Sequence, residues 1–198
     1  MTAITYIQFS FTQCIEGILM ARNGQPIQSL SAFTAALQAN PGSSSARLCR
    51  GLYYQAQGQY DHALRDMNKA IELSEFRPYI RSRLHRCRAI LHRQMHHVDM
   101  AIYDLNMAIA IDPDFTEVFS IRATVYLELG KPLLAVQDLD RVLELNPGLS
   151  SALSDKEQAL AIIQRNNRQI ITTHSCGARG RSSNQQTMQQ PRNHNRST

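Results

Sequence analysis

One sequence pattern recurs along this chain, and the repetition constrains the fold more than any other feature. The copies align on Ala63, Ala101 and Ala135, and a weaker copy is centred on Ser29. Successive copies lie 34, 38 and 34 residues apart, and the longer step contains a four-residue insert at 78–81. Small residues at the aligned places allow two helices to pack closely. Periods of this length are typical of arrays in which one small unit is stacked several times.

Each copy predicts two helices joined by a short turn. In the first helix of three copies, apolar residues recur at i, i+3 and i+7, which marks the buried stripe of an amphipathic helix. These residues are Ala46, Cys49 and Tyr53, then Leu84, Cys87 and Leu91, then Val118, Ile121 and Val125. Proline disfavours helix at the residue before it, so Pro41, Pro113 and Pro147 indicate where second helices end.

The 34-residue period and strings such as "RGLYYQAQGQYDHALRDMNKAIEL" resemble the tetratricopeptide repeat. The resemblance implies an all-α fold, a right-handed α-solenoid of about four helix-turn-helix units. It covers 10–43, 44–77, 82–115 and 116–149. It also implies that the first helices of the units line a concave groove in which partner peptides lie.

The segments that flank the repeats receive separate predictions. Residues 1–9 are expected to form an N-terminal extension. Residues 150–171 form an amphipathic pattern with Leu153 and Leu160 on one face, which favours a capping helix over the last unit. Residues 172–198 are rich in Gln, Asn, Ser, Arg and Gly, and this composition predicts a disordered basic tail.

A second regularity concerns charged residues. Three arginines occupy the same place in three units, and an aspartate follows each of them sixteen residues later. The pairs are Arg50 with Asp66, Arg88 with Asp104, and Arg122 with Asp138. These places are neighbours in an antiparallel helix pair, so the sequence predicts a salt bridge within each of the three hairpins.

Net charge and cysteine usage bound the environment of the chain. The formal charge of +5 comes from the tail, because six arginines and no acids follow from Arg165 onward. Four widely spaced cysteines without a CxxC pair suit a reducing compartment. No segment is apolar enough to span a bilayer. We expect a cytoplasmic protein without membrane attachment, and these features do not exclude a nuclear location.

The stretch "YIRSRLHRCRAILHR" at 79–93 supplies the candidate binding residues of the groove. Leu84, Cys87 and Leu91 belong to the core stripe, which leaves a second, exposed face. By the resemblance, the groove contains Ile18, Leu48, Leu52, Arg83, Arg86, Ile90, Arg93, Thr124 and Glu128. This groove would be apolar at one end, basic in the middle and polar-acidic at the other. The sequence thus favours a non-catalytic adaptor that binds a partner peptide with an apolar anchor and an acidic stretch.

Alternative functions are open at this point but have weaker sequence support. An RNA- or ribonucleoprotein-associated adaptor would use the arginine-rich helix at 81–93 and the basic tail, although the tail lacks aromatic residues for base stacking. The carboxylate clamp for chaperone tails is disfavoured, because only Arg83 fits among the matching places. Those places otherwise hold Cys14, Ile18, Cys49 and Cys87 if the clamp starts in the first unit, and Leu48, Leu52, Cys87, Glu117 and Ile121 if it starts in the second.

A metal site or an enzyme finds still less support in the sequence. His85, His92 and His96 have helical spacing, but we expect no nearby carboxylate to complete a metal site. No motif for catalysis or for a cofactor is present.

Overall fold

The computed structural model describes residues 3–179, with side chains described for 5–169. This described part consists of helices and contains no strand. The helices are α1 (Ala3–Arg22), α2 (Pro26–Ala39), α3 (Ser44–Ala56), α4 (Tyr60–Glu72), α5 (Pro78–Gln94), α6 (Val98–Ile111), α7 (Thr116–Glu128), α8 (Pro132–Leu145) and α9 (Ser150–Arg179).

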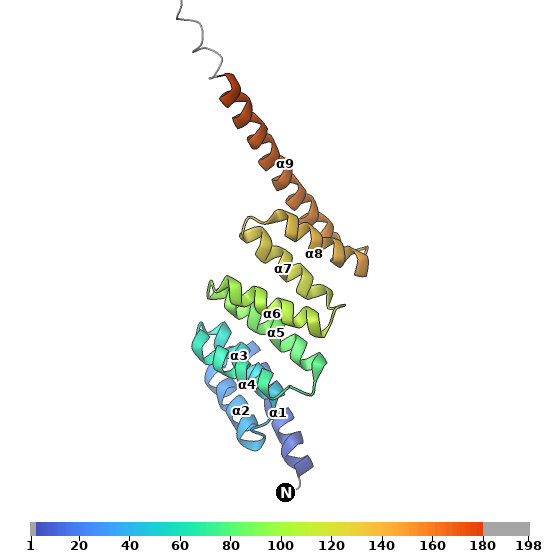
Figure 1. Ribbon diagram of the computed structural model, residues 1–198. Coiled ribbons are helices and arrows are strands. Elements are labelled where there is room, and N and C mark those ends of the chain that lie inside the picture. Colours follow the sequence, from blue (N-terminus) through green and yellow to red (C-terminus); the bar gives the residue numbers. More distant parts are fainter. Residues whose placement is uncertain (1–2, 180–198) are drawn as a thin grey trace, which may run out of the picture.

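Consecutive helices pack in pairs, and the pairs stack into one elongated array (Figure 1). The pairs are α1 with α2, α3 with α4, α5 with α6, and α7 with α8. Each second helix also packs on the first helix of the next pair. The buried core is therefore continuous from pair to pair; Leu105 of α6, for example, shares an apolar cluster with Val118 of α7.

Two helices begin earlier than the repeat boundaries predict. Residues 3–9, which the sequence assigns to an extension, form the first turns of α1, because nothing in this apolar segment breaks the helix. The insert at 78–81 lengthens α5 by about one turn, since Pro78 occupies the first helical position. Proline is well tolerated there, because its missing N–H would have had no helical partner.

Tight turns separate the two helices of each pair. Gly24, Gly58 and Gly130 have φ values of 71°, 72° and 66° in equivalent turns. In the third pair the same place is taken by His96, with φ 60°. This left-handed conformation suits glycine and is strained for a residue with a Cβ. The turn geometry is therefore kept even where its usual residue is absent.

The C-terminal helix α9 packs on α8 and then projects away from the array (Figure 1). Ala152 and Ala159 are buried on this side, at 2% and 0% exposed. The helix extends past residue 171 to Arg179, although the composition assigns 172–179 to a disordered tail. No proline interrupts 150–179, so no local signal ends the helix earlier. The rest of the predicted tail, 180–198, lies outside the described residues.

Candidate functional site

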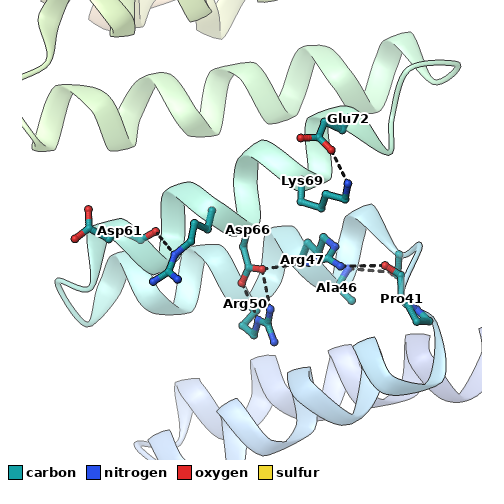
Figure 2. A network of polar contacts seen from close by, with 10 residues as sticks. Pro41, Ala46, Arg47, Arg50, Asp61, Asp66, Lys69 and Glu72 are labelled. Atoms are coloured by element: carbon teal, nitrogen blue, oxygen red, sulfur yellow. Dashed lines mark hydrogen bonds and ion pairs between the residues drawn. The ribbon is translucent and has the colours of Figure 1, made fainter.

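Each recurring arginine contacts the aspartate sixteen residues later, which joins the two helices of its pair. The two N–O distances are 2.7 and 2.8 Å for Arg50–Asp66, 2.8 and 2.7 Å for Arg88–Asp104, and 2.9 and 2.6 Å for Arg122–Asp138. Figure 2 shows the Arg50–Asp66 contact, in which Arg47 also approaches the Asp66 carboxylate. The three aspartates are at most 5% exposed. The hydrogen bonds to aspartate raise the pKa of both Arg50 and Arg122.

The third pair contains a larger polar cluster around Asp104. This carboxylate is fully buried, and besides Arg88 it lies 2.8 Å from His85 Nδ1 and 3.8 Å from His92 Nε2. Burial raises the pKa of Asp104, but the hydrogen bonds from Arg88 and His85 outweigh it, so the pKa is lowered. Burial also lowers the pKa of His92, which favours the neutral imidazole.

The expectation that no carboxylate lies near the histidines is therefore wrong. Asp104 comes from α6, the partner helix, so spacing within α5 could not reveal it. His96, which the sequence pattern grouped with them, lies exposed in the turn. Both oxygens of Asp104 already accept from Arg88. Among the side chains at 5–169, no three His, Cys, Asp or Glu residues are arranged to hold a metal ion.

Sequence reasoning missed a second polar contact, which joins consecutive pairs. Arg88 Nη1 donates to Asn68 of the preceding pair at 2.6 Å, and Arg122 Nη1 donates to Asn106 in the same way at 2.6 Å. The signal was the recurring Asp-x-Asn at 66–68 and 104–106. Arg88 and Arg122 thus each connect the two helices of their own pair with the second helix of the preceding pair.

In the last unit, the residue equivalent to Asn68 and Asn106 contacts α9. There the residue is Asp140, and it accepts from Lys156 Nζ of α9 at 2.6 Å.

The N-terminal end of the groove is apolar and hollow. Ile18 of α1 and Leu52 of α3 are each 42% exposed. They line a cavity of about 640 Å³ together with Phe33 and Tyr53, and Ile18 also lines a second cavity of about 730 Å³. Leu48, also predicted to lie in the groove, is half-buried and packs on the core cluster around Met67. Ile18 and Leu52 are therefore the exposed residues among those predicted at this end of the groove.

The middle of the groove is less basic than the sequence suggests. Arg86 pairs with Glu117 of α7, and Arg93 donates to Glu128 at 2.5 Å. The predicted basic and acidic groove residues therefore meet one another instead of forming separate patches. The sequence could not show this, because the contacts join residues 31 and 35 positions apart.

Three further groove candidates have different surroundings. Arg83 lies over the Tyr79 ring, with 4.2 Å from its guanidinium carbon to the ring centroid, and also 5.6 Å from the Phe115 ring. Stacking of this kind leaves the charge of an arginine without an acid to neutralise it. Ile90 is half-buried, and the Thr124 hydroxyl donates to the Ser120 carbonyl at 3.0 Å. Among the three arginines predicted in the groove, Arg83 therefore has aromatic neighbours, whereas Arg86 and Arg93 pair with acids.

Comparison with known proteins agrees with this architecture. A tetratricopeptide repeat family model matches residues 48–76. Human RNA polymerase II-associated protein 3 is 28% identical over 120 residues, which are 56% of this chain and 17% of that protein. The chain spans at most 20% of the length of the first curated relatives that it matches.

Solved structures share the same fold. PilF of Pseudomonas aeruginosa has a TM-score of 0.70 at 19% identity, covering 91% of this chain and 80% of that one. The first tetratricopeptide-repeat domain of Spaghetti (RPAP3), solved with the HSP90 peptide SRMEEVD, has a TM-score of 0.55 at 26% identity. That match covers 61% of this chain and 93% of the domain.

The described helices also include none that is both long and apolar enough to cross a membrane. Paired helices, recurring positions and similarity to known repeats all lead to one assignment. The chain matches the tetratricopeptide repeat at 48–76 and has the all-α fold of tetratricopeptide-repeat arrays.

Proposed function

We propose that this chain is a non-catalytic adaptor that holds a peptide or domain of another protein in its groove. The observation that carries the proposal is a mostly apolar cavity at the N-terminal end, lined by the exposed Ile18 and Leu52, with a second and more polar cavity that Ile18 also lines. Exposed apolar side chains gathered at a hollow are a common feature of protein-binding surfaces. A leucine or phenylalanine of a partner would fill such a cavity and remove these side chains from water.

Charge around the apolar end favours an acidic partner segment. The first helices α1, α3 and α5 contain eight arginines, no lysine and one acid, Glu16. Arg77 lines the second cavity, and Arg83 has an aromatic rather than an acidic neighbour. An apolar anchor followed by an acidic stretch would complement this surface.

The Spaghetti domain supports peptide binding as the general mode, since it was solved with the acidic peptide SRMEEVD. The places that form a carboxylate clamp in chaperone-binding relatives hold Cys14, Ile18 and Cys49 in this chain. Thiols and an apolar side chain cannot donate the strong hydrogen bonds that hold a terminal carboxylate. We therefore propose an anchor-binding groove rather than a clamp.

The RNA-associated alternative has less support. Within 81–93, Arg86, Arg88 and Arg93 are each engaged by an acid of a neighbouring helix. Phosphate contacts would have to compete with these pairs. Salt-dependent retention of RNA by the chain would favour the RNA alternative, whereas a groove that binds peptides should not retain RNA.

Selection from a random-peptide phage library against the whole chain tests the adaptor proposal. We expect enriched peptides to combine Leu, Ile or Phe with Asp or Glu. Leu52→Ser should weaken the selected peptides by about tenfold or more, because burying a leucine is worth about 1.5–3 kcal/mol. Leu133→Ser is the matched control, because Leu133 is 66% exposed on α8 and lines neither groove cavity. Equal affinities for the wild type and Leu52→Ser would refute the anchor.

A second comparison tests the charge. Arg83→Glu should weaken the same peptides, whereas Arg65→Glu on exposed α4 should leave them unchanged. The peptide SRMEEVD serves as the probe of a clamp. Tight binding of SRMEEVD that Leu52→Ser leaves unaltered would contradict the proposed mode.

A further inference from the structure

Two cysteines meet at the junction between the first and second helix pairs. Cys14 of α1 and Cys49 of α3 are 35 positions apart, and their thiols are in hydrogen-bonding contact. Cys14 also packs in one apolar cluster with Ala46, one turn before Cys49 on α3. Both cysteines line the same groove cavity of about 730 Å³, and Cys49 also lines the neighbouring cavity. Cys49 thus lies between the two cavities, and Cys14 lies beside it at the second cavity.

This junction also lacks the polar bridge found at the next two. Arg88 and Arg122 each donate to an asparagine of the preceding pair. The matching position in the first pair is Thr34, whose hydroxyl donates to Leu30 of its own helix instead. Among the described contacts of Arg50, the hydrogen-bond acceptor is Asp66 of its own pair. The first pair is therefore joined to the array by apolar packing, by the contact of the two thiols, and by a hydrogen bond from the Tyr53 hydroxyl to the Pro26 carbonyl at 2.9 Å.

The two thiols differ in reactivity. The hydrogen bond from Cys49 lowers the pKa of Cys14, while the same hydrogen bond and burial raise the pKa of Cys49. The thiolate is the form that attacks an oxidant, so the lowered pKa favours Cys14 as the attacking residue and Cys49 as the resolving one. Cys14 is only 7% exposed, so a small oxidant that enters through the cavity suits it best.

We propose that Cys14 and Cys49 form a peroxide-sensitive dithiol that closes to a reversible disulfide across the first junction of the array. The Cys14 thiolate attacks one oxygen of hydrogen peroxide, which forms a sulfenic acid and releases hydroxide. The Cys49 sulfur then attacks the Cys14 sulfur, expelling the oxygen as water and forming the S–S bond. The balance is two thiols and one hydrogen peroxide to one disulfide and two waters. A reducing thiol reverses the reaction.

The disulfide would fasten α1 to α3 at a junction that lacks the arginine–asparagine contact. It ties a 35-position loop, so it restricts the unfolded chain and raises the stability of the first two pairs. It also fixes the wall between the two groove cavities. The formation of the disulfide is independent of the proposed adaptor function, because it requires only the two thiols and a peroxide.

Peroxide titration of the full chain followed by tryptic mass mapping tests the proposal. Trypsin cleaves after Arg22, Arg47 and Arg50, so the predicted cross-link joins peptide 1–22 to peptide 48–50. This product identifies the pair regardless of the other cysteines. We expect it as the main product at low peroxide, with its loss on dithiothreitol treatment and a rise of several degrees in Tm on oxidation.

Cysteine variants distinguish disulfide formation between Cys14 and Cys49 from general thiol oxidation. Cys49→Ser should stop at the Cys14 sulfenic acid, which a dimedone probe labels, and Cys14→Ser should oxidise more slowly. Cys87→Ser is the matched control and should form the cross-link as the wild type does, since Cys87 is equally buried but packs among Ala63, Met67 and Leu91.

A second measurement uses only the wild type, so it tests the proposal even if the cysteine variants fold poorly. Phenylarsine oxide bridges two neighbouring thiols, so on the reduced wild type it should protect Cys14 and Cys49 together from alkylation and leave Cys87 unprotected. Oxidation of Cys14 to sulfinic acid without the 1–22 to 48–50 cross-link, or equal alkylation of Cys14 and Cys87 in the presence of the arsenical, would overturn the proposal.

Discussion

Removing the carboxylate of Asp104 should destabilise the array more than removing any other single acid. Asp104 is fully buried and accepts three hydrogen bonds, two from Arg88 and one from His85. Asp104→Ala leaves the Arg88 side chain, which is only 15% exposed, without its acid and with Asn68 as the remaining acceptor among the described residues. Breaking a buried pair in this way costs about 3–5 kcal/mol. We expect the upper half of this range, because a histidine also loses its partner.

The equivalent change in the second pair should cost less. Asp66 accepts two hydrogen bonds from Arg50, whose side chain is 21% exposed and can regain water. We expect about 2 kcal/mol for Asp66→Ala, between the values for exposed and buried pairs. Asp114→Ala is the surface control, because this aspartate side chain is 77% exposed although it lies 3.1 Å from Arg141. Its cost should be below about 1 kcal/mol.

Urea unfolding followed by helical circular dichroism measures the three variants side by side. The expected order of midpoints is Asp114→Ala highest, then Asp66→Ala, then Asp104→Ala. The double variant Arg88→Met with Asp104→Leu should recover part of the loss, because it removes the unpaired guanidinium while His85 still lacks its partner. A midpoint for Asp104→Ala equal to that of Asp114→Ala would refute the reasoning, as would a double variant no more stable than Asp104→Ala.

Three further predictions concern conformation, protonation and packing. His96→Gly should stabilise the chain by about 0.5–1 kcal/mol in thermal unfolding, because His96 has φ 60°, and an unchanged or lower Tm would contradict this strain. Burial lowers the pKa of His92, so the unfolded chain takes up a proton first as pH falls below about 6.5. Stability should therefore decline from that pH down to the lowered folded pKa, by up to about 1.4 kcal/mol per pH unit. His92→Tyr should flatten this decline, and urea midpoints with the same pH slope in both proteins would argue against it. Gly17→Ala should cost about 1–3 kcal/mol, because its Cβ would lie 2.6 Å from the Phe33 ring. Gly148→Ala has open space and should be neutral in the same thermal measurement, so equal Tm values for the two alanine variants would exclude a clash.

The sequence predicted the features that repeat with a fixed period. Amphipathic stripes, turn glycines and the prolines that end helices are local signals, because each acts through its own backbone or the next turn of helix. The arginine–aspartate pairing was predictable for the same reason. A constant spacing of sixteen residues across a short turn brings the two side chains together whenever the hairpin forms.

Other features depended on the particular residues at each junction. The recurring Asp-x-Asn was visible, but its role required the distance between one pair and the next. The continuation of α9 to Arg179 was also missed, because a polar composition does not by itself end a helix. Both cases show that composition and period describe single units better than the contacts between them.

The sequence by itself determined the type of unit, the number of helices in each repeat and the pairing within a hairpin, because all of these follow from short-range periodicity. Only the tertiary structure decided which charges stay available. Arg86 and Arg93 form ion pairs with Glu117 and Glu128 of α7. Asp104 of α6 contacts the buried histidines of α5. The physical reason is that the strength of a charge or thiol as a binding group depends on its neighbours in space, and stacking brings together residues that no local pattern connects.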